Sequence, residues 1–99
     1  MADPVVLINV FEVPSEEAEA FLAAWQLATD YMSGQPGFVD TSLHQALSPG
    51  TGFQFVNVAH WRTAEEFTAA IGSEGFRAAA AGMAGYHAHP ALYRVVART

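Results

Sequence analysis

The sequence predicts an α+β protein with a split β-α-β arrangement, in which helices cover one side of an antiparallel sheet. Three observations support this fold class. Strand-like and helix-like segments follow one another in the order β-α-β-β-α-β. A short turn rich in glycine and proline, residues 48–52, joins the two middle strands and favours a hairpin. The length of 99 residues allows one hydrophobic core, so we expect a single domain over 1–99.

The first half of the chain is expected to form a strand, a helix and a second strand. Residues 5–13 are a nearly continuous apolar, β-branched run that ends at a proline, which is typical of a strand. Ser15 is expected to cap a helix whose first turn is acidic. Apolar residues at helical spacing then predict a buried core stripe: Phe21, Leu22, Trp25, Ala28 and Met32. A Pro-Gly turn leads into a strand over 38–47.

The second half is expected to supply a strand, a broken helix and a last strand. Residues 53–61, FQFVNVAHW, form the expected third strand. A Thr-x-x-Glu capping box opens a short helix at Thr63, and a helix weakened by glycines begins at Ser73 and runs to about residue 84. The final strand is expected over 91–97, after Pro90.

Composition excludes several classes of function. Ten acidic residues stand against four arginines and no lysine, so the surface repels nucleic acid and anionic membranes. Without cysteine the chain has no disulfide, no thiolate nucleophile and no sulfur-ligated metal. It also lacks a basic leader region and a bilayer-length apolar run of about 20 residues, so we expect a cytoplasmic protein.

One polar side chain in the third strand suggests a binding site. Because side chains alternate along a strand, five residues share one face: Phe53, Phe55, Asn57, Ala59 and Trp61. A carboxamide among apolar groups is costly unless it finds a hydrogen-bond partner. Either protein groups satisfy Asn57, or Asn57 points into an apolar pocket that binds a small molecule.

The side of the sheet without helices should be apolar as well. It would carry Val6, Ile8, Val10, Val56 and Val58. Burying each such side chain contributes about 1.5–3 kcal/mol, so together they rival a domain's net stability of about 5–15 kcal/mol. No further element is available to cover them, and we therefore expect a homodimer in which two sheets pack face to face.

The histidines and arginines give weaker signals. His87 and His89 lie two apart on an extended segment and point the same way, but no third ligand is evident, so we expect no metal site. His44 is expected on the same strand face as Phe38, and Arg77 on the glycine-weakened helix. Taken alone, each is more typical of a solvated surface group than of a catalytic one.

Five segments together resemble the antibiotic biosynthesis monooxygenase superfamily of small ferredoxin-like proteins. They are VVLINVFEV, QPGFVDTSLH, FQFVNVAHWRTAEEF, the segment 73–77 and HPALYRVV. The resemblance covers nearly the whole chain and implies a ferredoxin-like fold assembled as a dimeric α+β barrel. The superfamily includes cofactor-free quinone-forming oxygenases, haem-degrading monooxygenases, isomerases and members without an assigned activity.

Similarity to the quinone-forming oxygenases implies a set of catalytic residues. In that branch a strand Asn and a Trp four residues later line the cavity, and here they match Asn57 and Trp61. A histidine on the preceding strand resembles His44, and a helix arginine resembles Arg77. Where those enzymes carry a tyrosine after the Trp, this chain has Phe67.

Similarity to the haem-degrading branch implies a different ligand. An Asn on the first strand and the Trp match Asn9 and Trp61, which adds Asn9 to the substrate-binding candidates. The axial histidine of that branch falls near Ala80, inside an alanine run, and a haem without an axial ligand is poorly held.

The resemblance therefore implies a cofactor-independent monooxygenase that oxidises an aromatic phenol or anthrone with O2 to a quinone. Phe53, Phe55 and Phe67 would form the pocket and Asn57 would hold the substrate oxygen. In the same mechanism His44 would accept the proton and Arg77 would stabilise negative charge. The alternatives are a non-catalytic dimeric module that binds a small molecule, and a haem-binding monooxygenase.

Overall fold

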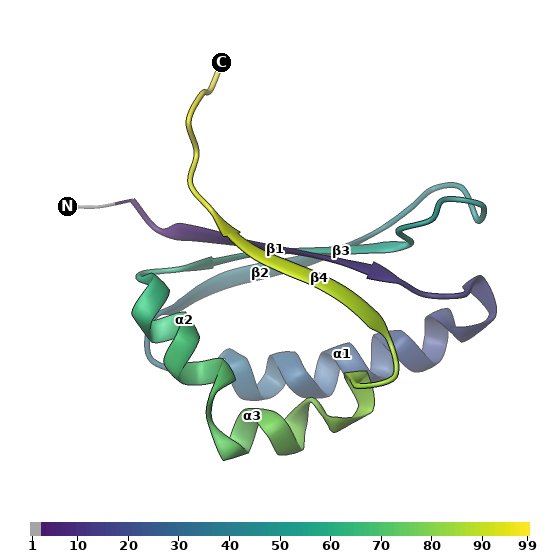
Figure 1. Cartoon of the computed structure of the whole chain (residues 1–99), viewed down its shortest axis with the longest axis horizontal. Coiled ribbons are helices and arrows are strands. Elements are labelled where there is room, and N and C mark those ends of the chain that lie inside the picture. The colour runs from purple at the N-terminus through teal and green to yellow at the C-terminus, as the bar shows by residue number, and fades with distance from the viewer. Residues whose placement is uncertain (1–2) are drawn as a thin grey trace.

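A computed structural model describes residues 3–99, and its elements follow the expected order (Figure 1). The strands are β1 (Val5–Glu12), β2 (Phe38–Gln45), β3 (Phe55–Trp61) and β4 (His87–Tyr93). The helices are α1 (Ala18–Met32), α2 (Ala64–Ile71) and α3 (Glu74–Ala79), with 3₁₀ turns η1 (Ser15–Glu17) and η2 (Ala81–Met83).

The strands form one sheet in the order β2-β3-β1-β4, and every neighbouring pair is antiparallel. All three helices lie on the same side of this sheet (Figure 1). This topology is the ferredoxin-like split β-α-β fold, which confirms the expected fold class. The expected break in the second helix is the junction between α2 and α3, where the Ser73 hydroxyl accepts from the backbone N–H of Phe76 at 3.1 Å.

Several element boundaries differ from the sequence prediction. The last strand is β4 at His87–Tyr93 and not 91–97, because Pro90 sits inside it, opposite Asn9. A proline is tolerated there because β4 is an edge strand and needs hydrogen bonds on one side only. The first α-helix begins at Ala18, after η1, and the Ser15 side chain makes no capping hydrogen bond.

A buried glutamine shapes the turn between β2 and β3. The Gln54 amide nitrogen lies 2.8–3.1 Å from the backbone carbonyl oxygens of residues 48, 49 and 51. This side chain therefore ties the loop together, and β3 begins at Phe55, two residues later than expected.

The core between sheet and helices is divided into two clusters. One contains Leu7, Ala59, Trp61, Phe67 and Ala70. The other contains Phe11, Val13, Phe21 and Phe55. The two clusters close opposite ends of the sheet, and the central part of β1 and β3 lies between them.

Gly37 makes the turn into β2, and only glycine fits it. Its φ is +90°, a conformation that side chains disfavour, and an added Cβ would lie 2.5 Å from the Cβ of Glu66. Replacing Gly37 by alanine should lower the free energy of unfolding by at least about 1–2 kcal/mol, the usual cost of a left-handed non-glycine residue. Urea denaturation measures the change.

The control for this substitution is Gly50→Ala. Gly50 has no atom within 4 Å of the added Cβ and no positive φ, so its replacement should change stability by less than about 0.5 kcal/mol. Equal losses in both variants would mean that Gly37 is not under conformational constraint.

The helix-free face of the sheet carries the expected apolar residues. Val6, Ile8 and Val10 of β1 stand opposite Tyr93, Ala91 and His89 of β4 and opposite the outward-facing residues of β3. After β4, segment 94–99 leaves the sheet on the side away from the helices (Figure 1). Val95 and Val96 are exposed on this segment. Among residues 3–99, no helix combines the length and apolar character needed to cross a membrane.

Candidate active site

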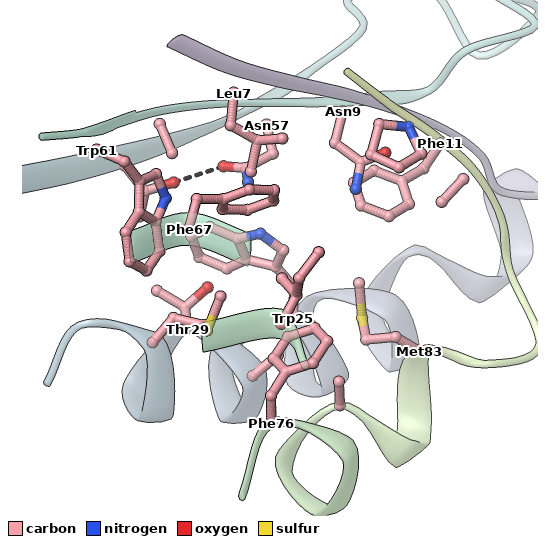
Figure 2. Close-up of a pocket in the computed structure, with 18 of the residues that line it drawn as sticks. Leu7, Asn9, Phe11, Trp25, Thr29, Asn57, Trp61, Phe67, Phe76 and Met83 are labelled. Carbon is pink, nitrogen blue, oxygen red and sulfur yellow. Dashed lines mark hydrogen bonds between the residues drawn. The ribbon is translucent and has the colours of Figure 1, made fainter. Parts of the chain in front are cut away.

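A pocket of about 680 Å³ lies between the sheet and the helices, in the gap between the two core clusters (Figure 2). Its lining comes from β1, β2, β3 and β4 above and from α1, α2, α3 and η2 below. Most lining groups are apolar, and the polar exceptions are few: Asn9, Asn57, Thr29 and Thr41, with the indole of Trp25. This size and composition are typical of a small-molecule site.

Two carboxamides face the pocket from neighbouring strands. Asn9 of β1 and Asn57 of β3 are directly opposite in the antiparallel ladder, so both point to the helix side. The Asn57 Oδ1 accepts a hydrogen bond from the Thr41 hydroxyl at 2.5 Å, and its NH2 group points into the pocket (Figure 2). The protein thus fixes the carbonyl end of Asn57 and leaves its donor end for a ligand.

Asn9 is an unusual core residue. Its NH2 group points into the pocket (Figure 2), and its Oδ1 is buried with no hydrogen-bond partner in the part of the chain that the structure describes. Leaving such an atom unpaired costs about 1–3 kcal/mol, which an apolar residue of similar size would avoid. Stability alone therefore does not explain an asparagine at this position.

Trp61 forms a rigid wall at one end of the pocket. Only 1% of its surface is exposed, and its ring packs edge-on against Phe38 and Phe67, with centroids 5.5 Å apart in each case. Of the predicted site residues, the structure brings Asn57, Trp61, Phe67 and Asn9 together in the lining of this pocket.

The two other predicted pocket aromatics lie elsewhere. Phe55 is buried in the second core cluster, stacked on Phe21 with ring centroids 4.6 Å apart. Phe53 precedes β3, is 47% exposed and packs edge-on against His89. Alternation along a strand gives the face correctly for Phe55, but it does not show which part of that face the helices seal.

The predicted acid–base residues also lie outside the pocket. His44 stands opposite Val56 on the helix-free face, with its Nδ1 3.2 Å from the Val56 carbonyl oxygen. A β-bulge between Phe38 and Asp40 shifts the alternation, so Phe38 faces the helices and His44 does not. Arg77 is exposed on α3, while the adjacent Phe76 lines the pocket.

The sequence reasoning missed most of the floor of the site. Trp25, Thr29 and Met32 reach the pocket from α1, and Phe76 and Met83 reach it from α3 and η2. Trp25 was expected in the core stripe of the first helix. It does lie on α1 and packs against the second core cluster, but its side chain also lines the pocket. A signal was present: Thr29 lies one turn after Trp25 on that apolar stripe, and a hydroxyl there indicates a surface that is not fully sealed.

The electrostatic character of the pocket is simple. Within residues 3–99, no aspartate, glutamate, histidine, lysine, arginine or tyrosine side chain lines it. Ala80 lines the wall where the resemblance to haem-degrading enzymes would require an axial histidine, so the pocket offers a haem iron no imidazole. The lining can donate hydrogen bonds to an aromatic molecule, but it cannot exchange protons with it.

Comparisons with known proteins agree with this geometry. Residues 4–82 match the family model for antibiotic biosynthesis monooxygenase. A candidate monooxygenase from Shewanella loihica PV-4 is 39% identical over 99% of both chains, with a TM-score of 0.85. The comparison with curated proteins found no similar sequence.

Two more distant structures share the fold alone. SnoaB, a cofactor-independent oxygenase from Streptomyces nogalater, is 21% identical, with 98% of this chain and 97% of that chain covered and a TM-score of 0.81. A dimeric protein of unknown function and ferredoxin-like fold from Bacteroides fragilis is 14% identical, with 93% and 96% covered and a TM-score of 0.73.

Proposed function

The chain belongs to the antibiotic biosynthesis monooxygenase family, and from that premise we propose that it is a cofactor-independent monooxygenase. Its proposed substrate is an aromatic phenol or anthrone, which it oxidises with O2 to a quinone. The observation that carries the proposal is the pair of carboxamide NH2 groups, from Asn9 and Asn57, aimed into an otherwise apolar pocket. SnoaB, which shares the fold, supports a reaction without a cofactor.

The reaction asks little of the protein beyond binding and charge stabilisation. An anthrone loses a proton from its methylene carbon and becomes an enolate. The enolate gives one electron to O2, and the carbon radical and superoxide combine to form a peroxide. The peroxide loses water as the second C–H bond breaks, so one oxygen atom ends in the quinone and the other in water.

The two amides act where negative charge collects. In the enolate the charge lies largely on the oxygen of the former ketone group, and NH2 donors from Asn9 and Asn57 would hydrogen-bond to that atom. Preorganised donors are most effective in a site that excludes water, because there they compete with no solvent dipoles. The aromatic walls, Trp61, Phe67 and Phe76, would hold the flat ring system in place.

The proton has no acceptor in the pocket lining. His44 and Arg77, expected to be the base and the charge-stabilising residue, lie outside the pocket. We therefore assign the proton to water at the pocket mouth and give neither residue a step in the reaction. The substrate then loses its proton because of its own acidity, which the two amide donors increase by stabilising the enolate.

This proposal predicts turnover with a characteristic pH dependence. With dithranol as the anthrone and EDTA present, the protein should consume one O2 per quinone formed, after subtraction of the rate without protein. Because only the substrate ionises, log kcat/KM should rise by about one per pH unit until the substrate is ionised. An oxygen electrode and quinone absorbance measure both quantities.

Three other results would point elsewhere. No oxygen uptake with several anthrones would favour a non-catalytic binding module. A Soret band on adding equimolar haemin would favour the haem-binding alternative. A loss of turnover in folded His44→Ala would restore His44 as the base.

We further propose that the protein works as a homodimer that packs through the helix-free face of the sheet, giving a dimeric α+β barrel. The support is the apolar surface along β1 and β3 and the segment 94–99, which lies on that side and carries two exposed valines. The Bacteroides fragilis protein of the same fold is dimeric. Light scattering is expected to return the mass of two chains, and the mass of one would overturn the proposal.

A further inference from the structure

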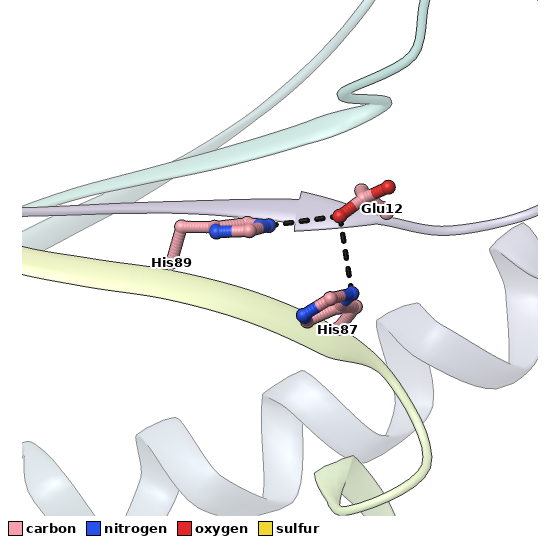
Figure 3. A group of neighbouring side chains, drawn as sticks. All are labelled: Glu12, His87 and His89. Atoms are coloured by element: carbon pink, nitrogen blue, oxygen red, sulfur yellow. Dashed lines mark hydrogen bonds and ion pairs between the residues drawn. The ribbon is translucent and has the colours of Figure 1, made fainter.

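A cluster of three potential metal ligands lies outside the pocket, on the helix-free face of the sheet (Figure 3). Glu12 ends β1 and stands directly opposite His87 of β4, while His89 lies two residues further along the same face. Glu12 Oε2 is 3.2 Å from His87 Nδ1 and 2.8 Å from His89 Nε2. The sequence pointed to the two histidines as a pair of possible ligands. The fold adds a third, Glu12, which lies 75 residues before His87 in the chain.

We propose that Glu12, His87 and His89 bind one divalent transition-metal ion, with Zn²⁺ the best fit. Around Zn²⁺, nitrogen and oxygen ligands lie about 2.0–2.2 Å from the ion, so neighbouring donor atoms are roughly 3 Å apart. The donor atoms here all lie within 4.8 Å of one another, so an ion needs only small side-chain rotations to enter between them. Two imidazoles and one carboxylate, with water in a fourth position, are a known ligand set for Zn²⁺.

The choice of metal follows from the ligand types. Imidazole nitrogen suits Zn²⁺, Cu²⁺ and Ni²⁺, whereas Mg²⁺ and Ca²⁺ prefer sites made of oxygen atoms. The side chains of Glu12, His87 and His89 are 47%, 73% and 43% exposed in the single chain, so no other part of the same chain shields them from an ion. The overall charge of −6 attracts cations of every kind and gives no selectivity between them.

The surroundings hold the ligands in place. The Phe53 ring packs edge-on against His89 with centroids 5.5 Å apart, and the His87 and His89 rings are 4.8 Å apart. Phe53, expected in the pocket, thus belongs to the shell of this cluster, where it restricts the rotation of a ligand.

Metal binding would connect the edge strand to its neighbour. Glu12 belongs to β1 and both histidines belong to β4, so one ion would bridge the two strands at the end where β4 begins. Ala88 and Pro90 alternate with these histidines along β4, so they lie on the opposite face of the strand, where they line the pocket. The ion would therefore fix the backbone that carries one wall of the pocket, without entering the pocket.

The test is to measure Zn²⁺ binding to the 99-residue chain, without a histidine tag, by isothermal titration calorimetry. One ion per chain is expected, and the melting temperature should rise on adding Zn²⁺. His87→Ala, His89→Ala and Glu12→Gln should each weaken binding at least about tenfold, because each substitution removes one direct ligand of the ion. Because all three residues are exposed, the metal-free variants should melt close to the unsubstituted protein.

His60→Ala is the matched control. His60 lies 2.6 Å from the carboxylate of Asp40, so it reproduces one histidine–carboxylate pair without the second histidine. Its replacement should leave Zn²⁺ affinity unchanged, and a tenfold excess of Mg²⁺ should not compete. The proposal is overturned by the absence of a Zn²⁺ site, by equal weakening in His60→Ala, or by affinity that none of the three cluster variants lowers.

Discussion

Replacing Asn57 by alanine is expected to lower kcat/KM for anthrone oxidation by about 10²–10³, the usual effect of removing one preorganised donor to a developing oxyanion. Thr41 fixes the carbonyl end of Asn57, so its NH2 group is already oriented before substrate binds. Alanine removes this donor and leaves a gap that water can enter. The loss should fall mainly on kcat, because the charge develops after binding.

Asn57→Ala should fold normally, since the side chain is only partly buried. Steady-state oxygen uptake and thermal unfolding, measured on the same preparation, separate the catalytic effect from a structural one. Ser42→Ala is the control, because it removes a hydroxyl from the opposite face of the same sheet. An unchanged kcat/KM in folded Asn57→Ala would remove Asn57 from the mechanism.

Asn9→Ala extends the experiment to the second amide. If both NH2 groups donate to the same substrate oxygen, the two substitutions should not be additive, and the double variant should lose less than the product of the single losses. Simple additivity would mean that Asn9 and Asn57 contact different parts of the substrate.

Replacing Phe21 by alanine is expected to lower the free energy of unfolding by about 3–5 kcal/mol. Phe21 of α1 has no exposed surface and is the centre of the second core cluster. Its ring contacts Phe11 edge-on, stacks on Phe55 and meets Tyr86 edge-on, with centroids 4.6–5.1 Å apart. Alanine would leave a cavity that two strands and the segment before β4 cannot close.

Urea denaturation of Phe21→Ala and of Leu27→Ala gives the comparison. Leu27 belongs to the same helix but is 65% exposed, so its truncation should change stability by less than about 0.5 kcal/mol. If Phe21→Ala is too unstable to purify, Phe21→Leu keeps most of the apolar volume and should show a smaller loss of the same sign. A loss below 1 kcal/mol in Phe21→Ala would contradict the assigned packing.

Patterns that depend on neighbouring residues predicted most of the fold. The apolar, β-branched run of β1, the capping box at Thr63 and the turn after β2 gave the order of elements and hence the antiparallel sheet. Alternation along β3 placed Asn57, Ala59 and Trp61 on the helix side, where all three line the pocket. These features are local, because each depends on spacing within a few residues.

Three features of the structure depended on events that spacing does not encode. The bulge after Phe38 changed the face of His44, because one extra residue reverses the alternation of a strand. Pro90 entered β4 because that strand is at an edge, which only the strand order reveals. Glu12 joined the two histidines through strand pairing over a long sequence separation.

The pocket between the two core clusters also has a consequence for how the molecule unfolds. A chain that filled this space with its own side chains would gain packing contacts, so the native state forgoes part of the stability that its length allows. A bound aromatic molecule restores those contacts only in the folded state and shifts the unfolding equilibrium toward it. Resistance to heat therefore depends on occupancy, and a melting curve reports which small molecules the protein accepts before any turnover is seen.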